Sequence, residues 1–312
     1  MNGGQINCNI FLKSTFLLSM TTLKNDFFEV SVDAHGAELT SVRTKNDDFL
    51  WCGDKAYWGR HAPILFPIVG KVWNDEYRVD GEVYRLGQHG FARDMDFELV
   101  DSTATEATLV LRSSQETLAK YPYPFELTAR YALKENELEM EWRVANKGDK
   151  PMYYQIGAHP AFLYRDFDSQ DECHGYLQLL RDGKVVESGR VSRLGTLGVV
   201  GERGEEMVFE EGRMALTDEL FMNDALIFED SQADGAVLLD KEGRPYLRVG
   251  FEGSPVLGVW SPKGRRAPFV CIEPWKGRAD AEGFVGDIAQ REWIQHLAAG
   301  GQQVFRYEIG LM

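Results

Sequence analysis

The chain has 312 residues, of which 44% are hydrophobic and 27% are charged, the composition of an ordinary globular protein that can bury a sizeable core. Its 49 acidic and 34 basic residues give a formal net charge of -15, which would repel nucleic-acid phosphates and anionic lipids. We therefore expect no nucleic-acid partner and no membrane partner, and no apolar run approaches the length that spans a bilayer.

The first 20 residues differ from the rest of the chain. Their apolar stretch, FLKSTFLLSM, lacks the polar flank and the small-residue cleavage site of a secretory signal. We expect residues 1–20 to be an N-terminal extension or a disordered arm. Residues 21–312 are expected to form a single domain, because β-sandwiches of more than about 200 residues are common and no Pro/Ser-rich linker divides the chain.

The cysteines indicate the redox environment. The four of them, at positions 8, 52, 173 and 271, lie far apart and match neither a metal-binding nor a redox spacing. They favour reduced thiols in a cytoplasmic protein.

Short runs of alternating, β-branched and aromatic residues follow from Phe27 onward, separated by Gly, Asp, Asn and Pro. Glu76–Leu86 predicts a hairpin, because Asp80-Gly81 supplies the positive φ angles of a two-residue turn. A short helix is expected at Gln115–Lys120, where a preceding serine can cap it. Further strands are expected at DFELVD, EATLVLRS, FELTARYAL, ELEMEWRVAN, MYYQI, ALIFED, AVLLD, YLRVGF, VLGVW, PFVCIE and VFRYEI. The chain is predicted to be an all-β sandwich of many antiparallel strands.

A histidine leaves one of these strands in QIGAHPAFLY (Gln155–Tyr164). His159 precedes Pro160, a residue that cannot continue a central strand ladder. This histidine either faces a cavity or is a partly exposed turn residue.

A carboxylate follows an apolar strand in PFVCIEPW. Glu273 is expected at the end of that strand, where it must reach water, find a partner or raise its pKa. Trp275 next to it could stack on the C–H face of a sugar ring. A solvated glutamate at a strand end is the alternative interpretation.

Two further segments carry basic residues. GQHGFARDMDFEL places His89 and Arg93 in a Gly-containing loop, where Arg93 either binds a ligand or pairs with a neighbouring aspartate. YWGRHAPILFPIVGKV carries Arg60 and Lys71 around an apolar stretch, and by itself it is typical of an irregular core segment.

These four segments, in this order, resemble the aldose 1-epimerase (galactose mutarotase-like) superfamily. RHAPILFPIVGK and QHGFARDMDFE resemble its LacX-like branch, and the resemblance covers roughly Leu23 to Ile309. It implies a β-supersandwich fold, an active site on the concave face of one sheet, and no cofactor and no metal.

The resemblance also assigns site residues. His159 in GAHPAF and Glu273 in CIEPW match the catalytic histidine and glutamate of the family, and His89 in QHGFAR matches a sugar-binding histidine. Asp224 in MNDALIF matches a substrate-binding aspartate, with Asn223 as the alternative.

The remaining expected binding residues are less specific. Lys71 in IVGK stands where many members have an arginine, so the charge is kept but the planar guanidinium is lost. Arg60, Arg93 and Trp275 complete the expected binding set.

The function implied is aldose 1-epimerase (mutarotase) activity on a hexose such as glucose or galactose, in a monomer or homodimer. Glu273 would take the proton of the anomeric hydroxyl, and His159, as an imidazolium, would protonate the ring oxygen. The alternatives are a hexose-6-phosphate mutarotase, a non-catalytic sugar-binding or regulatory module, and a glycoside hydrolase, which would need two flanking carboxylates.

Overall fold

The computed structural model describes residues 20–195, 197–201 and 204–312, and every pairing between its named strands is antiparallel. The all-β prediction is confirmed. Most of the expected N-terminal extension, residues 1–19, lies outside the described residues, and β1 begins at Met20. That residues 21–312 form a single domain stays a prediction.

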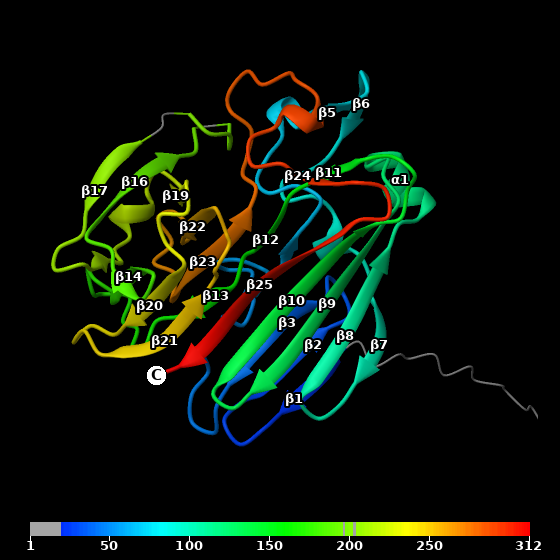
Figure 1. The fold of residues 1–312 in the computed structure, drawn as a ribbon. Helices are drawn as coiled ribbons and strands as arrows, with labels where there is room; N and C mark the ends of the chain where they lie inside the picture. Colours follow the sequence, from blue (N-terminus) through cyan, green and yellow to red (C-terminus); the bar gives the residue numbers. More distant parts are fainter. Residues whose placement is uncertain (1–19, 196, 202–203) are drawn as a thin grey trace, which may run out of the picture.

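The larger sheet has ten strands and runs through the length of the molecule (Figure 1). Its strands, in spatial order, are β15 (Lys184–Val185), β14 (Tyr176–Arg181), β20 (Gly235–Leu239), β21 (Pro245–Gly250), β25 (Gln302–Leu311), β10 (Glu137–Asn146), β9 (Phe125–Lys134), β8 (Glu106–Arg112) and β7 (Glu98–Ser102), and β18 (Met214–Ala215) pairs with β14. Alternate residues of β9, among them Leu127 and Ala129, are buried, as the two-residue period of a strand with one covered face requires.

A three-stranded sheet covers one face of β8–β10 (Figure 1). It consists of β1 (Met20–Lys24), β2 (Glu29–Asp33) and β3 (Glu38–Arg43). Leu23, Val30 and Leu39 from this sheet belong to the same buried cluster as Leu127 of β9. The hydroxyl of Tyr131 in β9 also donates a hydrogen bond to the carbonyl of Ala37 beside β3. The two sheets therefore share one apolar core.

An eight-stranded sheet carries the catalytic candidates. Its strands, in spatial order, are β17 (Glu205–Val208), β16 (Ser188–Arg193), β19 (Leu226–Phe228), β22 (Val256–Trp260), β23 (Phe269–Lys276), β12 (Ile156–Ala158) and β4 (Ile64–Leu65), and β13 (Ala161–Leu163) pairs with β23.

The local elements expected from turn and cap residues are present. β5 (Glu76–Val79) and β6 (Glu82–Arg85) pair around Asp80-Gly81, whose φ angles are 51° and 86°. Helix α1 (Gln115–Lys120) starts where the Ser114 side chain accepts a hydrogen bond from the Thr117 backbone N–H. The other short elements are η1 (Trp73–Asp75), η2 (Ala92–Asp94), η3 (Glu219–Phe221) and η4 (Ile288–Gln290), which are 3-10 helices, and the pair β11 (Met152–Tyr154) and β24 (Gln295–Leu297).

Strand β23 is longer than expected, so the placement of Glu273 at a strand end is wrong. The strand continues through Pro274 to Lys276. Pro274 is tolerated because it lies between the stretches of β23 that pair with β12 and β13, where no ladder bond is needed on that side. Glu273 is therefore held inside a sheet, opposite Gly258 of β22.

Within the described residues, no helix combines the length and the apolar character needed to cross a membrane. Cys52, Cys173 and Cys271 are free thiols, and Cys8 lies outside the described residues.

Candidate active site

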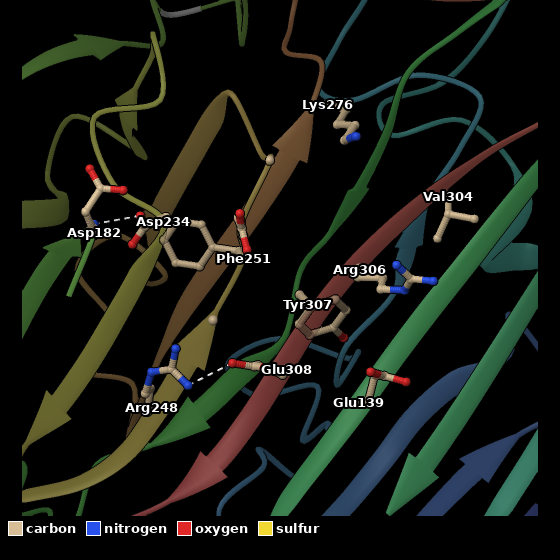
Figure 2. A pocket seen from close by; sticks show the side chains of 13 residues that line it. Glu139, Asp182, Asp234, Arg248, Phe251, Lys276, Val304, Arg306, Tyr307 and Glu308 are labelled. Atoms are coloured by element: carbon tan, nitrogen blue, oxygen red, sulfur yellow. Dashed lines mark hydrogen bonds and ion pairs between the residues drawn. The ribbon is translucent and has the colours of Figure 1, made fainter. Parts of the chain in front are cut away.

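Six of the eight expected site residues line one cavity, which has a volume of about 290 Å³. They are Glu273, His159, His89, Arg93, Asp224 and Trp275. A larger cavity of about 660 Å³, on the ten-stranded sheet, contains none of these residues (Figure 2). The smaller cavity is therefore the candidate active site.

His159 and Glu273 face each other across neighbouring strand segments. Gly157 of β12 pairs with Trp275 of β23, and Ala161 of β13 pairs with Cys271 of β23. This register places His159 opposite Glu273. The ladder is interrupted between these two pairs, at the His159–Pro160 step that the sequence singled out. Both side chains line the cavity.

The two side chains are almost completely buried. Nε2 of His159 lies 3.1 Å from Oε2 of Glu273, and the residues are 7% and 1% exposed. Within the described part of the chain, Nδ1 of His159 and Oε2 of Glu273 have no well-oriented hydrogen-bond partner. Unsatisfied buried polar atoms are rare in folded proteins, and those lining a cavity are natural contacts for a polar ligand.

Burial alters the protonation expected for each group alone. It raises the pKa of Glu273 well above its ordinary value, and the Asp224 carboxylate raises it further. Burial, together with the positive charge of Arg93, lowers the pKa of His159 to about 3. These shifts favour a neutral pair, with a proton on the glutamate rather than on the imidazole.

Three aromatic rings surround the imidazole of His159. The indole of Trp58 stacks on it with a centroid distance of 4.7 Å and an interplanar angle of 24°. Trp260 and His89 meet it edge-on, at 5.6 Å and 5.5 Å. These contacts fix the plane of the ring, and the face of Trp58 favours a positive charge on it.

His89 is held as a neutral tautomer with its proton on Nε2. The backbone N–H of Gly70 donates a hydrogen bond of 3.0 Å to His89 Nδ1, and the His89 backbone N–H donates to the Gly70 carbonyl at 2.8 Å. Burial lowers the pKa of His89 well below its ordinary value, and the nearby His159 lowers it further. Nε2 of His89 therefore carries the proton, and it lies 3.2 Å from the side-chain amide of Gln88, which also lines the cavity.

Arg93 places a guanidinium in the cavity wall. Its Nη2 donates to the Gln88 carbonyl at 2.6 Å, and its Nε lies 3.8 Å from Asp94. Burial and the neighbouring Arg60 lower the pKa of Arg93 to about 10, so the side chain is still a cation at neutral pH. At 3.8 Å the contact with Asp94 is an ion pair without a hydrogen bond, because Nε of Arg93 has no hydrogen-bond partner within the described residues.

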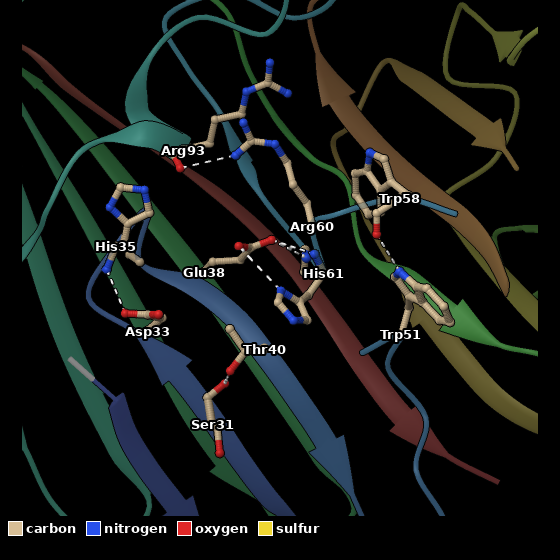
Figure 3. Close-up of polar contacts among 12 residues, drawn as sticks. Ser31, Asp33, His35, Glu38, Thr40, Trp51, Trp58, Arg60, His61 and Arg93 are labelled. Atoms are coloured by element: carbon tan, nitrogen blue, oxygen red, sulfur yellow. Dashed lines mark hydrogen bonds and ion pairs between the residues drawn. The ribbon is translucent and has the colours of Figure 1, made fainter. Parts of the chain in front are cut away.

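Arg60 and Lys71 do not line the cavity, contrary to expectation. Arg60 donates to the Asp94 carboxylate at 2.8 Å. It also donates to the Arg93 carbonyl at 3.5 Å (Figure 3). The amine of Lys71 lies 3.4 Å from the carboxylate of Asp75. In both cases the basic side chain is paired with an acidic residue.

The structure distinguishes Asp224 from Asn223. Asp224 lines the cavity and Asn223 does not, although both residues are exposed. Asp224 has a φ of 66°, and its Oδ1 accepts a hydrogen bond of 2.7 Å from the Ala225 backbone N–H. This local bond holds its carboxylate at the start of β19.

Trp275 forms part of the cavity floor. Its indole packs on Gly157 and Gly258 so closely that a Cβ on either would lie 2.4 Å or 2.5 Å from a ring atom. Its Nε1 donates to the Ala158 carbonyl at 3.2 Å. Trp275 is only 4% exposed, so its indole offers a sugar ring little surface for stacking.

Sequence reasoning missed two tryptophans of the site, Trp58 and Trp260, as well as Gln88. Trp58 stands two positions before Arg60, within one of the four segments that resemble the family. The segment therefore indicates a site residue, but the tryptophan and not the arginine lines the cavity. The loop of Trp58 is anchored by Trp51, whose Nε1 donates to the Trp58 carbonyl at 2.8 Å (Figure 3). Glu38 anchors it further by accepting from the backbone N–H of His61 at 2.7 Å.

One group of potential metal ligands includes the catalytic pair. Ligand atoms of His159, Cys271 and Glu273 lie within 4.8 Å of one another, and all three residues are buried. Burial raises the pKa of the Cys271 thiol well above its ordinary value, as it does for Glu273, so both would be protonated. Such a donor set fits a metal poorly, because metal ligation requires the thiolate and the carboxylate.

Comparison with known proteins identifies the family. The family model for aldose 1-epimerase matches residues 19–308. Protein LacX of Lactococcus lactis subsp. lactis is 31% identical over 264 residues, covering 82% of this chain and 87% of LacX. The chain belongs to the aldose 1-epimerase family, in its LacX-like branch, as the sequence motifs predicted.

Solved structures show the same fold. The galactose mutarotase related enzyme of Lactobacillus acidophilus superposes with a TM-score of 0.85 at 32% identity, covering 94% of this chain and 97% of that one. A galactose mutarotase-like protein of Lactobacillus casei gives a TM-score of 0.84 at 31% identity, covering 94% and 100%. The predicted galactose mutarotase-like sandwich is thereby confirmed.

Proposed function

We propose that this protein is an aldose 1-epimerase that interconverts the α and β anomers of a neutral hexose such as glucose or galactose. The observation that carries the proposal is the buried contact of 3.1 Å between His159 and Glu273 in a cavity of about 290 Å³. That volume is near the lower end of small-molecule sites, which range over about 300–1,000 Å³, and suits a single sugar ring.

The proposed reaction moves one proton from the anomeric hydroxyl to the ring oxygen. Shifting the shared proton from Glu273 to His159 changes no net charge and produces the carboxylate and the imidazolium that the reaction needs. Glu273 then accepts the proton of the anomeric hydroxyl while His159 donates its proton to the ring oxygen, and the ring opens to the aldehyde. After rotation about the bond between C1 and C2, the reverse transfers close the ring on its other face.

Other residues of the cavity are assigned to holding the sugar. Nε2–H of His89 and the guanidinium of Arg93 are donors to sugar oxygens, and the Asp224 carboxylate is an acceptor for hydroxyl protons. Trp58 and Trp260 provide the apolar walls expected of a sugar site. Positioning of this kind can lower the barrier by about 7 kcal/mol or more in favourable cases.

The charge balance of the cavity favours a neutral sugar over a sugar phosphate. Phosphate sites usually use several convergent donors, and here the carboxylates of Asp94 and Asp75 engage Arg60 and Lys71. Arg93 remains as the cation of the described cavity lining, with Asp224 in the same wall. A hexose 6-phosphate is the alternative substrate, and Arg93 is the residue that would favour it.

A cytoplasmic setting is part of the proposal, supported by the free thiols of the described cysteines. The test is polarimetry on freshly dissolved α-glucose and α-galactose with purified protein. The proposal is supported if the optical rotation of at least one of these sugars decays faster with the protein than without it. Sugar binding without faster decay would instead make the protein a binding module.

A further inference from the structure

The larger cavity, of about 660 Å³, lies where β10, β21 and β25 of the ten-stranded sheet approach the end of β23 (Figure 2). Most charged side chains in its wall have ionic partners. Arg248 lies 2.7 Å from Glu308, and Arg306 lies 2.6 Å from Glu141 outside the lining. Glu139 is paired with Lys134 at 2.7 Å. These contacts pair both arginines of the wall with carboxylates, whereas Asp234 and Glu252 form no ion pair within the described residues.

Among the basic residues of this wall, Lys276 differs from Arg248 and Arg306 in having no ionic partner within the described residues. Its side chain is half-buried, and within the described residues no hydrogen bond or ion pair involves its amine. Burial lowers the pKa of Lys276, and no charged neighbour contributes to or offsets this shift. Other lysines, such as Lys147 beside Glu126 and Lys241 beside Asp171, have carboxylate partners.

The backbone of Lys276 is held firmly in place. Lys276 pairs with Ile156 of β12 as the last residue of β23. The next residue, Gly277, has a φ of 151° and packs so tightly on Gln155 that a Cβ would lie 2.5 Å from that side chain. Because side chains alternate along a strand, Trp275 faces the candidate active site while Lys276 faces the larger cavity.

We propose that Lys276 is a covalent attachment site at which small aldehydes entering the larger cavity condense with the side-chain amine. An amine without an ionic partner, partly removed from water and opening onto a cavity is the setting in which lysine acts as a nucleophile. The chemical class of the ligand is a small hydroxyaldehyde, including the open-chain forms of short sugars. The inference does not depend on the function proposed for the smaller cavity.

The reaction is balanced without an oxidant or a reductant. The lone pair of the neutral amine attacks the carbonyl carbon, and the carbonyl oxygen takes up the proton released by nitrogen, giving a carbinolamine. Loss of this hydroxyl together with the remaining proton on nitrogen, as water, leaves an imine between the Lys276 nitrogen and the aldehyde carbon. Hydrolysis reverses both steps, so the adduct forms and dissociates until it is trapped.

The test is trapping with glycolaldehyde as the probe. The full chain is incubated at pH 7 with glycolaldehyde and cyanoborohydride, which reduces the imine to a stable amine, and early labelling of each lysine is measured by peptide mass spectrometry. The exposed residues Lys184 and Lys263 are the internal controls. We expect Lys276 to be labelled roughly fivefold or more faster than either control, because each unit by which an amine pKa falls gives about tenfold more neutral amine.

Two controls complete the experiment. Lys276→Arg should lose this adduct and keep the slow labelling of the other lysines, whereas Lys263→Arg should leave the Lys276 adduct unchanged. In concentrated urea the preference for Lys276 should disappear, because it depends on the folded cavity. The proposal would be overturned if the exposed lysines of the native protein are labelled faster than Lys276. It would also be overturned if the preference for Lys276 persists in urea. The wild-type comparison decides the matter even if Lys276→Arg does not fold.

Discussion

His159 and Glu273 lie opposite each other across an interruption in the β12–β23–β13 ladder, with Nε2 and Oε2 3.1 Å apart. This register does more than bring an acid and a base together. Glu273 is held by its pairing with Gly258 of β22, His159 lies in the gap between β12 and β13, and both residues line one cavity. A sugar bound in this cavity would meet both groups at once.

The first prediction concerns this pair. Glu273→Gln and His159→Ala should each lower turnover by roughly two orders of magnitude or more, the range usual for loss of a general acid or base. The double variant should lose less free energy of activation than the two single variants together, because the two groups act as a unit. Anomer-exchange rates of folded variants measure this, and a single variant at the wild-type rate would show that the role is misassigned.

The second prediction concerns stability and pH. Above the ordinary histidine pKa of 6.5, the unfolded chain has released the protons of both residues, whereas the native pair keeps one because the pKa of Glu273 is raised. The native state then binds more protons than the unfolded state, so the free energy of unfolding falls as pH rises. The Glu273→Gln variant lacks the group that binds this proton. In the folded variant, His159 is neutral at these pH values.

We therefore expect Glu273→Gln to be more stable than wild type above pH 6.5, despite its lower activity. The difference should grow with pH by up to about 1.4 kcal/mol per unit between pH 6.5 and 8. Urea unfolding of both proteins at several pH values provides the measurement. Stability curves that remain parallel across this range would mean that the native pair does not retain its proton.

The third prediction concerns substrate charge. For wild type, kcat/KM should be higher for glucose or galactose than for the corresponding 6-phosphates, because Asp94 and Asp75 engage Arg60 and Lys71. Arg60→Met serves as the matched control, since it removes a cation outside the cavity lining and should change this ratio little. If a 6-phosphate is preferred by about tenfold or more, and this preference shrinks as salt rises, the substrate is a sugar phosphate.

Much of the fold follows from patterns that operate within a few residues. The Asp80-Gly81 turn and the helix at Gln115–Lys120 depend on turn and cap chemistry, and both occur at the residues expected. The end of β23 does not follow such a rule, because Pro274 normally indicates the end of a central strand. Its tolerance depends on the gap between β12 and β13, a feature of the assembled sheet.

The site shows the same division. His159 and Glu273 carry recognisable motifs, and the structure brings them together as expected. Trp58 could not be placed, because its stacking on His159 joins a loop to a strand segment about a hundred positions away. Arg60 was expected at the ligand, but its partner Asp94 lies in another segment, and only the fold shows that this carboxylate is within reach.

The central claim is that the pair of His159 and Glu273 opens and closes a sugar ring, and exchange spectroscopy at anomeric equilibrium tests it most directly. NMR magnetisation transfer between the anomeric signals of glucose and of galactose would be recorded with wild type, with Glu273→Gln and with no protein. We predict exchange that rises in proportion to the wild-type concentration and that falls by roughly two orders of magnitude or more with Glu273→Gln. Exchange with wild type no faster than in buffer for every aldose tested, or equally fast with Glu273→Gln, would contradict the account.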